Sequence, residues 1–264
     1  TYYKAIANVV GPEYSVYGLL AKEHQNVINS INSDLTAIID IDAMAERYID
    51  LIRSVQPTGP YKFLGHSFGG FIAFEVSKKL MERGEVVENI FLVDVLLPSA
   101  SYPHWYQQLL KIKDTLRIGG AKGLFRKTTD KVRTKANTLT ATLASKTPHN
   151  LLESQSMLAR QVRQSYQHAM KAYLPSVLTA STSTLLIRAH ETLANHSKRA
   201  DFGWEKLLKG SFKIRDVDGD HLSCTSSPNV ELIGQHLREA LEENRSETVE
   251  QNNTQSELNT VDQI

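Results

Sequence analysis

The sequence has few of the features that mark secreted, membrane-spanning or strongly charged proteins. It contains one cysteine, Cys224, so no disulfide can form within the chain. No apolar run approaches the roughly 20 residues of a membrane-spanning helix, and the first residues carry no secretory signal pattern. The net charge of +1 gives no overall attraction to nucleic acid or to a lipid surface. These absences predict a cytoplasmic globular protein that binds neither nucleic acid nor membrane.

Short β-type runs alternate with amphipathic helical stretches along most of the 264 residues. The spacing predicts helices over 42–55, capped by Asp42, and over 68–83, and a final helix capped by Ser227. Such alternation is typical of an α/β fold in which helices cover both faces of a mostly parallel sheet. The predicted strands are residues 14–20, 61–64, 89–95, 183–189 and 211–217.

Two segments depart from this alternation. Residues 99–175 show no convincing strand and carry 13 Lys and Arg against three acidic residues, which indicates a basic, helical insertion. This insertion is either a lid over a cleft, facing an acidic partner, or a solvated helical surface. Residues 244–264 are polar with few apolar side chains, so we predict a folded domain over 1–243 and a disordered tail beyond it.

The strongest chemical signal is residues 65–69 (GHSFG), which fit the G-x-S-x-G pattern between a predicted strand and a predicted helix. In that context the chain turns sharply and lifts the serine oxygen out of the sheet, so we predict that Ser67 is a nucleophile. Crowding in the turn explains the small residues Gly65 and Gly69. Because the helix N-terminus favours negative charge, the backbone N–H of Phe68 is the predicted oxyanion donor.

A serine nucleophile needs a base and an acid that orients the base. His221 follows the last predicted strand and precedes the last helix, which favours it over the weaker candidates His190 and His196. Asp94 and Glu191 each end a predicted strand at the carboxyl edge of the sheet, where active sites of open α/β folds lie. Burial favours Asp94, but the spacing leaves both acids open.

With these residues in place, the chain resembles the type I thioesterase domains of nonribosomal peptide synthetases and polyketide synthases over about residues 1–242. The resemblance implies an α/β-hydrolase fold with a helical lid, a nucleophile at Ser67, an acid at Asp94 and a base at His221. It is carried by residues 16–19 (VYGL), 56–61 (QPTGPY), 65–70 (GHSFGG), 73–75 (AFE), 92–94 (LVD) and 219–221 (GDH).

The resemblance implies a thioesterase that releases an acyl or peptidyl chain from the phosphopantetheine of an upstream carrier protein. Release would pass through an acyl-enzyme on the serine, ending in hydrolysis or macrocyclisation, without a cofactor or metal of the domain's own. The alternatives are a stand-alone editing (type II) thioesterase and a catalytically weakened domain that only docks a carrier. The first helix is expected almost at Thr1, so the family's N-terminal strand and the loop that donates a second oxyanion N–H are missing before it.

Overall fold

The computed structural model describes residues 2–19, 39–103, 106 and 149–261. The chain divides into two compact units. The first comprises Thr1–Leu20, Asp40–Ala100 and Ala172–Ile264, and the second comprises Ala21–Ile39 and Ser101–Lys171. The sheet and all the predicted site residues belong to the first unit.

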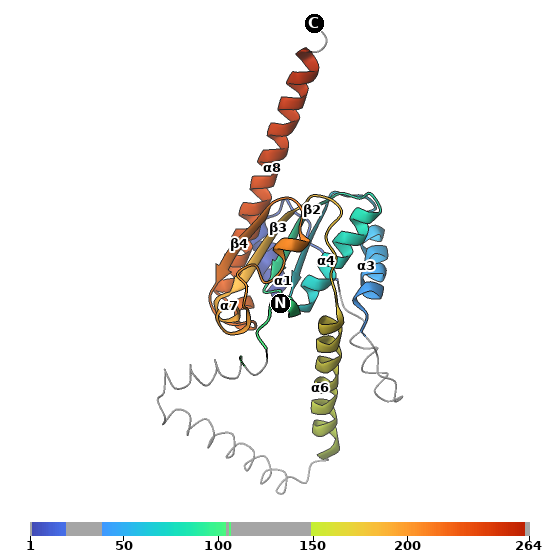
Figure 1. The fold of residues 1–264 in the computed structure, drawn as a ribbon, viewed down its shortest axis with the longest axis vertical. Coiled ribbons are helices and arrows are strands. Elements are labelled where there is room, and N and C mark those ends of the chain that lie inside the picture. Colours follow the sequence, from blue (N-terminus) through green and yellow to red (C-terminus); the bar gives the residue numbers. More distant parts are fainter. Residues whose placement is uncertain (1, 20–38, 104–105, 107–148, 262–264) are drawn as a thin grey trace. The chain divides into compact units, whose positions relative to one another are not determined.

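The centre of the first unit is a four-stranded sheet in the order β1-β2-β3-β4, with every neighbouring pair parallel. Figure 1 shows the strands side by side. Because parallel strands end at the same edge, the chain segments that follow them gather there. The predicted α/β architecture is therefore confirmed. The strands are β1 Tyr61–His66, β2 Val87–Val93, β3 Ser183–Ala189 and β4 Phe212–Val217.

One face of the sheet is covered by α1 (Tyr2–Val10) and α8 (Asn229–Val261), which pack against each other. Alternate strand residues such as Phe91 and Ile187 form a buried cluster with Ile6 of α1 and with the apolar stripe of α8. All four members of that predicted stripe are buried, which confirms it: Val230, Ile233, Leu237 and Leu241.

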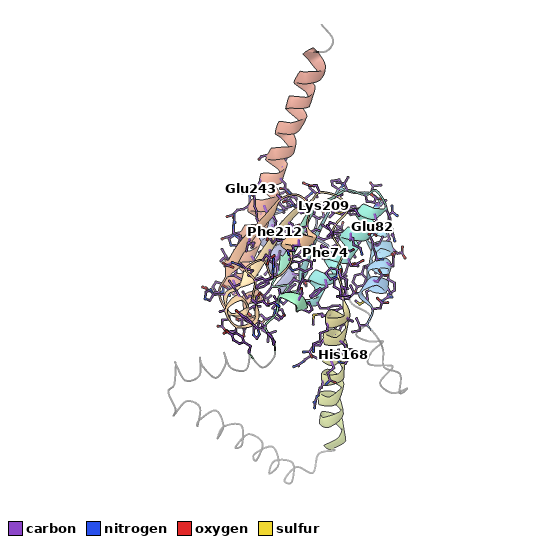
Figure 2. The ribbon with its side chains drawn as sticks, in the orientation of Figure 1. Phe74, Glu82, His168, Lys209, Phe212 and Glu243 are labelled. Carbon is purple, nitrogen blue, oxygen red and sulfur yellow. The ribbon has the colours of Figure 1, made fainter. Side chains whose placement is uncertain are left out.

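On β2, Ile90 and Leu92 alternate with the residues of that cluster and are also fully buried, so they point to the other face of the sheet. The helix α4 (Phe68–Glu82) packs against β1 and β2, and α3 (Ile41–Val55) packs against α4. Phe74 of α4, labelled in Figure 2, is fully buried with its ring centroid 4.9 Å from that of Trp204. Both faces of the sheet therefore carry helices, as predicted.

The strand predicted at residues 14–20 is wrong for its described part. Residues 14–19 form no strand, and the side chains of Val16, Tyr17 and Leu19 are 48%, 71% and 47% exposed. Apolar residues favour a strand only when a neighbouring ladder is available to them. This segment pairs with no described strand, although Tyr14 packs against the core.

The predicted helix caps also differ from the observed ones. Asp40, rather than Asp42, caps α3 by accepting the backbone N–H groups of Asp42 and Ala43. At the start of α8, the hydroxyl of Ser227 donates to the carboxylate of Glu231 instead of accepting a backbone N–H. Whether a residue caps a helix depends on its backbone angles. Asp40 and Asp42 are the same residue type, so the sequence alone does not choose between them.

The polar C-terminal segment is helical through Val261, whereas residues 244–264 were expected to be disordered. No Gly or Pro occurs after Gly234, and Glu, Gln, Arg and Leu are tolerated well in helices. A polar composition therefore does not by itself exclude a helix in this segment. Lys213 of β4 forms an ion pair of 2.6 Å with Glu243, labelled on α8 in Figure 2.

The predicted insertion, residues 99–175, contains the helix α6 (His149–Ala172) and no strand of the sheet among its described residues. Residues 107–148, which carry most of its basic side chains, lie outside the described residues. The described chain begins with α1 at Tyr2, as expected for the first helix. None of the helices in the described ranges is long and apolar enough to cross a membrane.

Candidate active site

Ser67 occupies the turn between β1 and α4 with φ 53° and ψ −125°. A non-glycine residue in this region of backbone space is strained, and surrounding contacts must hold it there. The backbone N–H of Ser67 donates to the carbonyl of Val93 at 3.1 Å, so the last residue of β2 fixes the turn. Phe68, the predicted oxyanion donor, is the first residue of α4.

Glycine is required at two positions around this turn. A Cβ at Gly65 would lie 2.3 Å from the carbonyl oxygen of Gly69, and one at Gly70 would lie 2.2 Å from a methyl of Val95. At Gly69 itself, the nearest atom to an added Cβ is the hydroxyl of Tyr3, at 3.8 Å. The expected crowding thus falls on Gly65 and Gly70, because the helix backbone crosses Gly65 while Gly69 faces outward.

A chain of hydrogen bonds joins the three residues predicted to do chemistry. The Oγ of Ser67 lies 2.7 Å from the Nε2 of His221, and the Nδ1 of His221 lies 2.7 Å from the Oδ2 of Asp94. A carboxylate oxygen only accepts, so the proton of His221 resides on Nδ1 and Nε2 accepts from the serine hydroxyl. This arrangement can remove a proton from Ser67 as its oxygen attacks.

Asp94 is 1% exposed and has a positive φ of 49° immediately after β2. Its Oδ1 accepts the backbone N–H of Ala189 at 2.9 Å, and its Oδ2 also accepts the hydroxyl of Thr192 at 2.7 Å. Within the described part of the chain, its one ion-pair partner is His221. Its buried charge is therefore balanced by a set of short hydrogen bonds.

The loop that carries His221 is held by its neighbour Asp220. The Oδ1 of Asp220 accepts the backbone N–H groups of Leu222 and Ser223 and the Ser223 hydroxyl, at 2.8–3.0 Å. These bonds hold the pKa of the Asp220 carboxyl below its usual range. Gly219 has a φ of +84°, and a Cβ there would lie 2.3 Å from the Ser223 hydroxyl. His221 therefore projects from a tightly wound turn.

The rival residues lie elsewhere. Glu191 has an exposed side chain, while its backbone N–H donates to the carbonyl of Gly219 at 2.9 Å. His190 is exposed, and His196 is half-buried at the end of the short helix α7 (His190–His196). Both ring nitrogens of His221 are bonded to Ser67 and Asp94 instead.

Two neighbours of this cluster escaped the sequence interpretation. The ring of His66 stacks on that of His221 with centroids 4.9 Å apart. Thr192 contacts a carboxylate 98 positions away in the sequence, so no local pattern could reveal it. Neither contact follows from a short pattern such as residues 65–69.

A shallow hollow lies at the other edge of the sheet, where β1 and β2 begin. It has a volume of about 450 Å³ and is lined by residues that include Pro60, Glu85 and Val86. Ser67 and Asp94 follow the opposite ends of the same strands. The hollow is therefore separate from the hydrogen-bonded cluster.

The comparison with known families agrees with this geometry. The thioesterase-domain family model matches residues 3–241. The chain belongs to this family. It is a thioesterase domain, which gives it serine-hydrolase character, and polyketide synthases are among the proteins it resembles.

The relatives of this thioesterase domain include very long proteins. It is 26% identical over 230 residues to the non-reducing polyketide synthase stmB of Aspergillus ustus, covering 76% of this chain and 10% of that protein. It is 41% identical over 90 residues to indigoidine synthase of Dickeya dadantii, covering 34% of this chain and 6% of that protein. The chain thus spans about a tenth or less of the curated relatives named here.

One solved structure supports the fold of the thioesterase domain. A holo four-domain nonribosomal peptide synthetase, bound to AMP and glycine, matches with a TM-score of 0.50 and 24% identity. The match covers 76% of this chain and 16% of that one. It agrees with the α/β-hydrolase arrangement of parallel strands and flanking helices.

Proposed function

We propose that this thioesterase domain releases an acyl or peptidyl chain from the phosphopantetheine thioester of a carrier protein, using Ser67 as nucleophile, His221 as base and Asp94 as the orienting acid. The observation that carries the proposal is the continuous pair of 2.7 Å hydrogen bonds from Ser67 through His221 to Asp94. The long relatives, which include a polyketide synthase and indigoidine synthase, support a role within a multidomain protein over a stand-alone editing enzyme.

In the acylation step, His221 removes the Ser67 proton as Oγ attacks the thioester carbonyl carbon. Negative charge develops on the carbonyl oxygen, where the N-terminus of α4 and the Phe68 N–H are proposed to stabilise it. When the C–S bond breaks, the imidazolium of His221 gives its proton to the departing pantetheine sulfur. Asp94 stabilises the charged ring between these two transfers.

In the second step, a water molecule or a nucleophile of the bound chain attacks the Ser67 ester. His221 again accepts the proton and then returns it to the Ser67 oxygen. Attack by water gives a free acid, and attack by a hydroxyl or amine of the chain gives a ring. The proposed mechanism calls on no metal or cofactor of the domain itself. The three side chains carry out the proton transfers, and the pantetheine arrives with the substrate.

A fluorophosphonate reagent tests this assignment without knowledge of the acyl chain, because it modifies activated serines. We expect labelling of the wild-type chain, none of Ser67→Ala, and strongly reduced labelling of His221→Ala. His190→Ala is the matched control and should label like wild type. Absence of labelling in the wild-type chain would contradict the proposed enzyme and favour a domain that only docks a carrier.

We further propose that the carrier is acidic and approaches the basic insertion of residues 99–175. That segment has a surplus of ten positive charges (13 minus 3), while the whole chain has a net charge of +1. Charge attraction of this kind acts mainly on association rate and is screened over about 8 Å at physiological salt. Salt should therefore lower kcat/KM for a carrier-bound thioester and leave the same acyl group on N-acetylcysteamine almost unaffected.

Charge reversal in the insertion gives the matching experiment. The triple change Lys122→Glu, Arg126→Glu and Lys127→Glu should lower kcat/KM for the carrier-bound substrate alone. Equal salt sensitivity of both substrates would show that these side chains merely solvate the insertion.

A further inference from the structure

All four strands of the sheet supply a residue to the hydrogen-bonded cluster at their carboxyl ends. Ser67 follows β1, Asp94 follows β2 and His221 lies beyond β4. The segment after β3 continues directly into α7, where Thr192 lies. Thr192 is 5% exposed, so its hydroxyl needs a partner within the protein.

The partner of Thr192 is the carboxylate oxygen that faces the base. Its Oγ1 donates to the Oδ2 of Asp94 at 2.7 Å, and the same Oδ2 lies 2.7 Å from the Nδ1 of His221. The backbone N–H of Ala189 holds the other oxygen at 2.9 Å. Two donors from the β3–α7 segment therefore act on both oxygens and fix the rotation of the carboxylate group.

The same segment also contacts the loop of the base. The backbone N–H of Glu191 donates to the carbonyl of Gly219 at 2.9 Å, two residues before His221. The backbone N–H of Asp94 donates to the carbonyl of Ile187 in β3 at 2.7 Å. The end of β3 and the first turn of α7 thus link the loop of the acid to the loop of the base.

We propose that Thr192 is a positioning residue for the thioesterase reaction, whose hydroxyl holds the Asp94 carboxylate in the orientation that aligns His221 with Ser67. The proposal rests on the proposed function. It assigns the hydroxyl, rather than the methyl group, as the part of the side chain that matters for rate. Loss of this hydrogen bond to a charged group should lower the rate about 10- to 100-fold, which corresponds to about 1.4–2.7 kcal/mol.

Substitutions at Thr192 can separate the hydroxyl from the methyl. Thr192→Val keeps the shape and removes the hydroxyl, and Thr192→Ser keeps the hydroxyl and removes the methyl. The rate constant for fluorophosphonate labelling of Ser67 should fall about 10- to 100-fold in Thr192→Val. In Thr192→Ser it should stay close to the wild-type value, even if the melting temperature falls.

Thr182→Val is the matched control, because Thr182 is a second buried threonine just before the other end of β3. It is 5% exposed, and its hydroxyl donates to the carbonyl of Glu88 at 3.2 Å. This variant should lose stability and keep the wild-type labelling rate. If Thr192→Val also keeps the wild-type rate, or if Thr192→Ser is as slow as Thr192→Val, the proposal is wrong.

Two further measurements keep the test decisive if Thr192→Val does not fold or if Ser67 does not react with the reagent. Thr192→Ala needs no space for a second methyl, so comparison of the Ala and Ser variants isolates the hydroxyl if Thr192→Val does not fold. The low-field ¹H NMR resonance of the His221 Nδ1 proton reports its bond to Asp94 without any catalysis. It should shift in the Val and Ala variants and persist in the Ser variant; no shift would overturn the proposal even where labelling fails.

Discussion

The imidazole of His66 lies flat against that of His221, with ring centroids 4.9 Å apart and an angle of 27° between the planes. Its Nε2 is 3.2 Å from the backbone carbonyl oxygen of His221, and a carbonyl only accepts, so this nitrogen carries a proton. Burial, reinforced by the neighbouring charge of a protonated His221, lowers the pKa of His66 below its ordinary value of 6.5. His66 is therefore a neutral support for the ring that faces Ser67.

The lowered pKa of His66 predicts a loss of stability in acid. The unfolded chain binds a proton at this site near pH 6.5, whereas the folded chain binds it only at lower pH. Unfolding is therefore favoured progressively as pH falls from about 6.5 toward the folded pKa. In His66→Gln, the drop in melting temperature between pH 7.5 and pH 5 should be smaller, by about 3–5 °C for each unit of pKa lowering.

The control for this measurement is His190→Gln, because His190 is exposed on α7. Its melting temperature should fall with pH as in the wild-type chain. Equal acid sensitivity of His66→Gln and wild type would contradict the neutral support.

Exchange of the two candidate acids for amides separates their roles. Asp94→Asn should lower the rate of thioester cleavage by about 10³–10⁴, because an amide facing Nδ1 favours the wrong tautomer of His221. Glu191→Gln should change it little, since its side chain is exposed and its contact with Gly219 is through the backbone. Steady-state kinetics with an N-acetylcysteamine thioester measure both, and the reverse result would move the acid to α7.

Glu75 of α4 is a buried carboxylate that accepts a hydrogen bond from Tyr173. It is 2% exposed, with Lys78 at 2.6 Å from one oxygen and the Tyr173 hydroxyl at 2.6 Å from the other. Burial and the charge of Glu75 raise the pKa of Tyr173, so the phenol keeps its proton and donates. Tyr173→Phe should therefore lower the free energy of unfolding by about 1–3 kcal/mol.

Urea titration followed by circular dichroism gives this free energy. Tyr17→Phe is the matched control, because Tyr17 is 71% exposed, and it should change the free energy by less than about 0.5 kcal/mol. Similar small values for both variants would show that the Tyr173–Glu75 bond adds no net stability.

The end of α8 should be dispensable for stability. Leu241 is buried and Glu243 pairs with Lys213, so a chain ending after Glu243 keeps both contacts. Its melting temperature should lie within about 2 °C of the full chain. A chain ending after His236 loses Leu237 and Leu241 and should melt at least about 5 °C lower, because buried leucines are removed from the core. A large drop on the first truncation would show that residues 244–264 pack on the domain.

The sequence pointed to Ser67 and His221 because the information on these two residues is local. Ser67 lies in a five-residue pattern between a strand and a helix, and His221 lies in the loop that the order of elements brings to the same edge. The choice between Asp94 and Glu191 was not local, because each follows a strand at that edge. It depends on backbone angles after the strand, such as the positive φ of Asp94, which place one carboxylate inside and leave the other in solvent.

The errors in the predicted fold have a related cause. Residues 14–19 have the apolar content of a strand, but a strand also needs a neighbour to bond with, and the sequence does not show whether one is present. Residues 244–261 lack apolar content, yet a helix satisfies its own backbone and needs no such neighbour. Apolar content alone thus predicts neither the burial nor the backbone conformation of residues 14–19.

The hydrogen-bonded side chains belong to one unit of the chain and most of the insertion to the other. The insertion leaves the first unit after Ala100 and returns at Ala172, while Ser67, Asp94, Thr192 and His221 all belong to the first unit. The hydrogen bonds that join these four side chains involve no residue between Ser101 and Lys171. The segment between Ala100 and Ala172 can therefore differ in sequence and length from one such domain to another while these four side chains keep their hydrogen bonds.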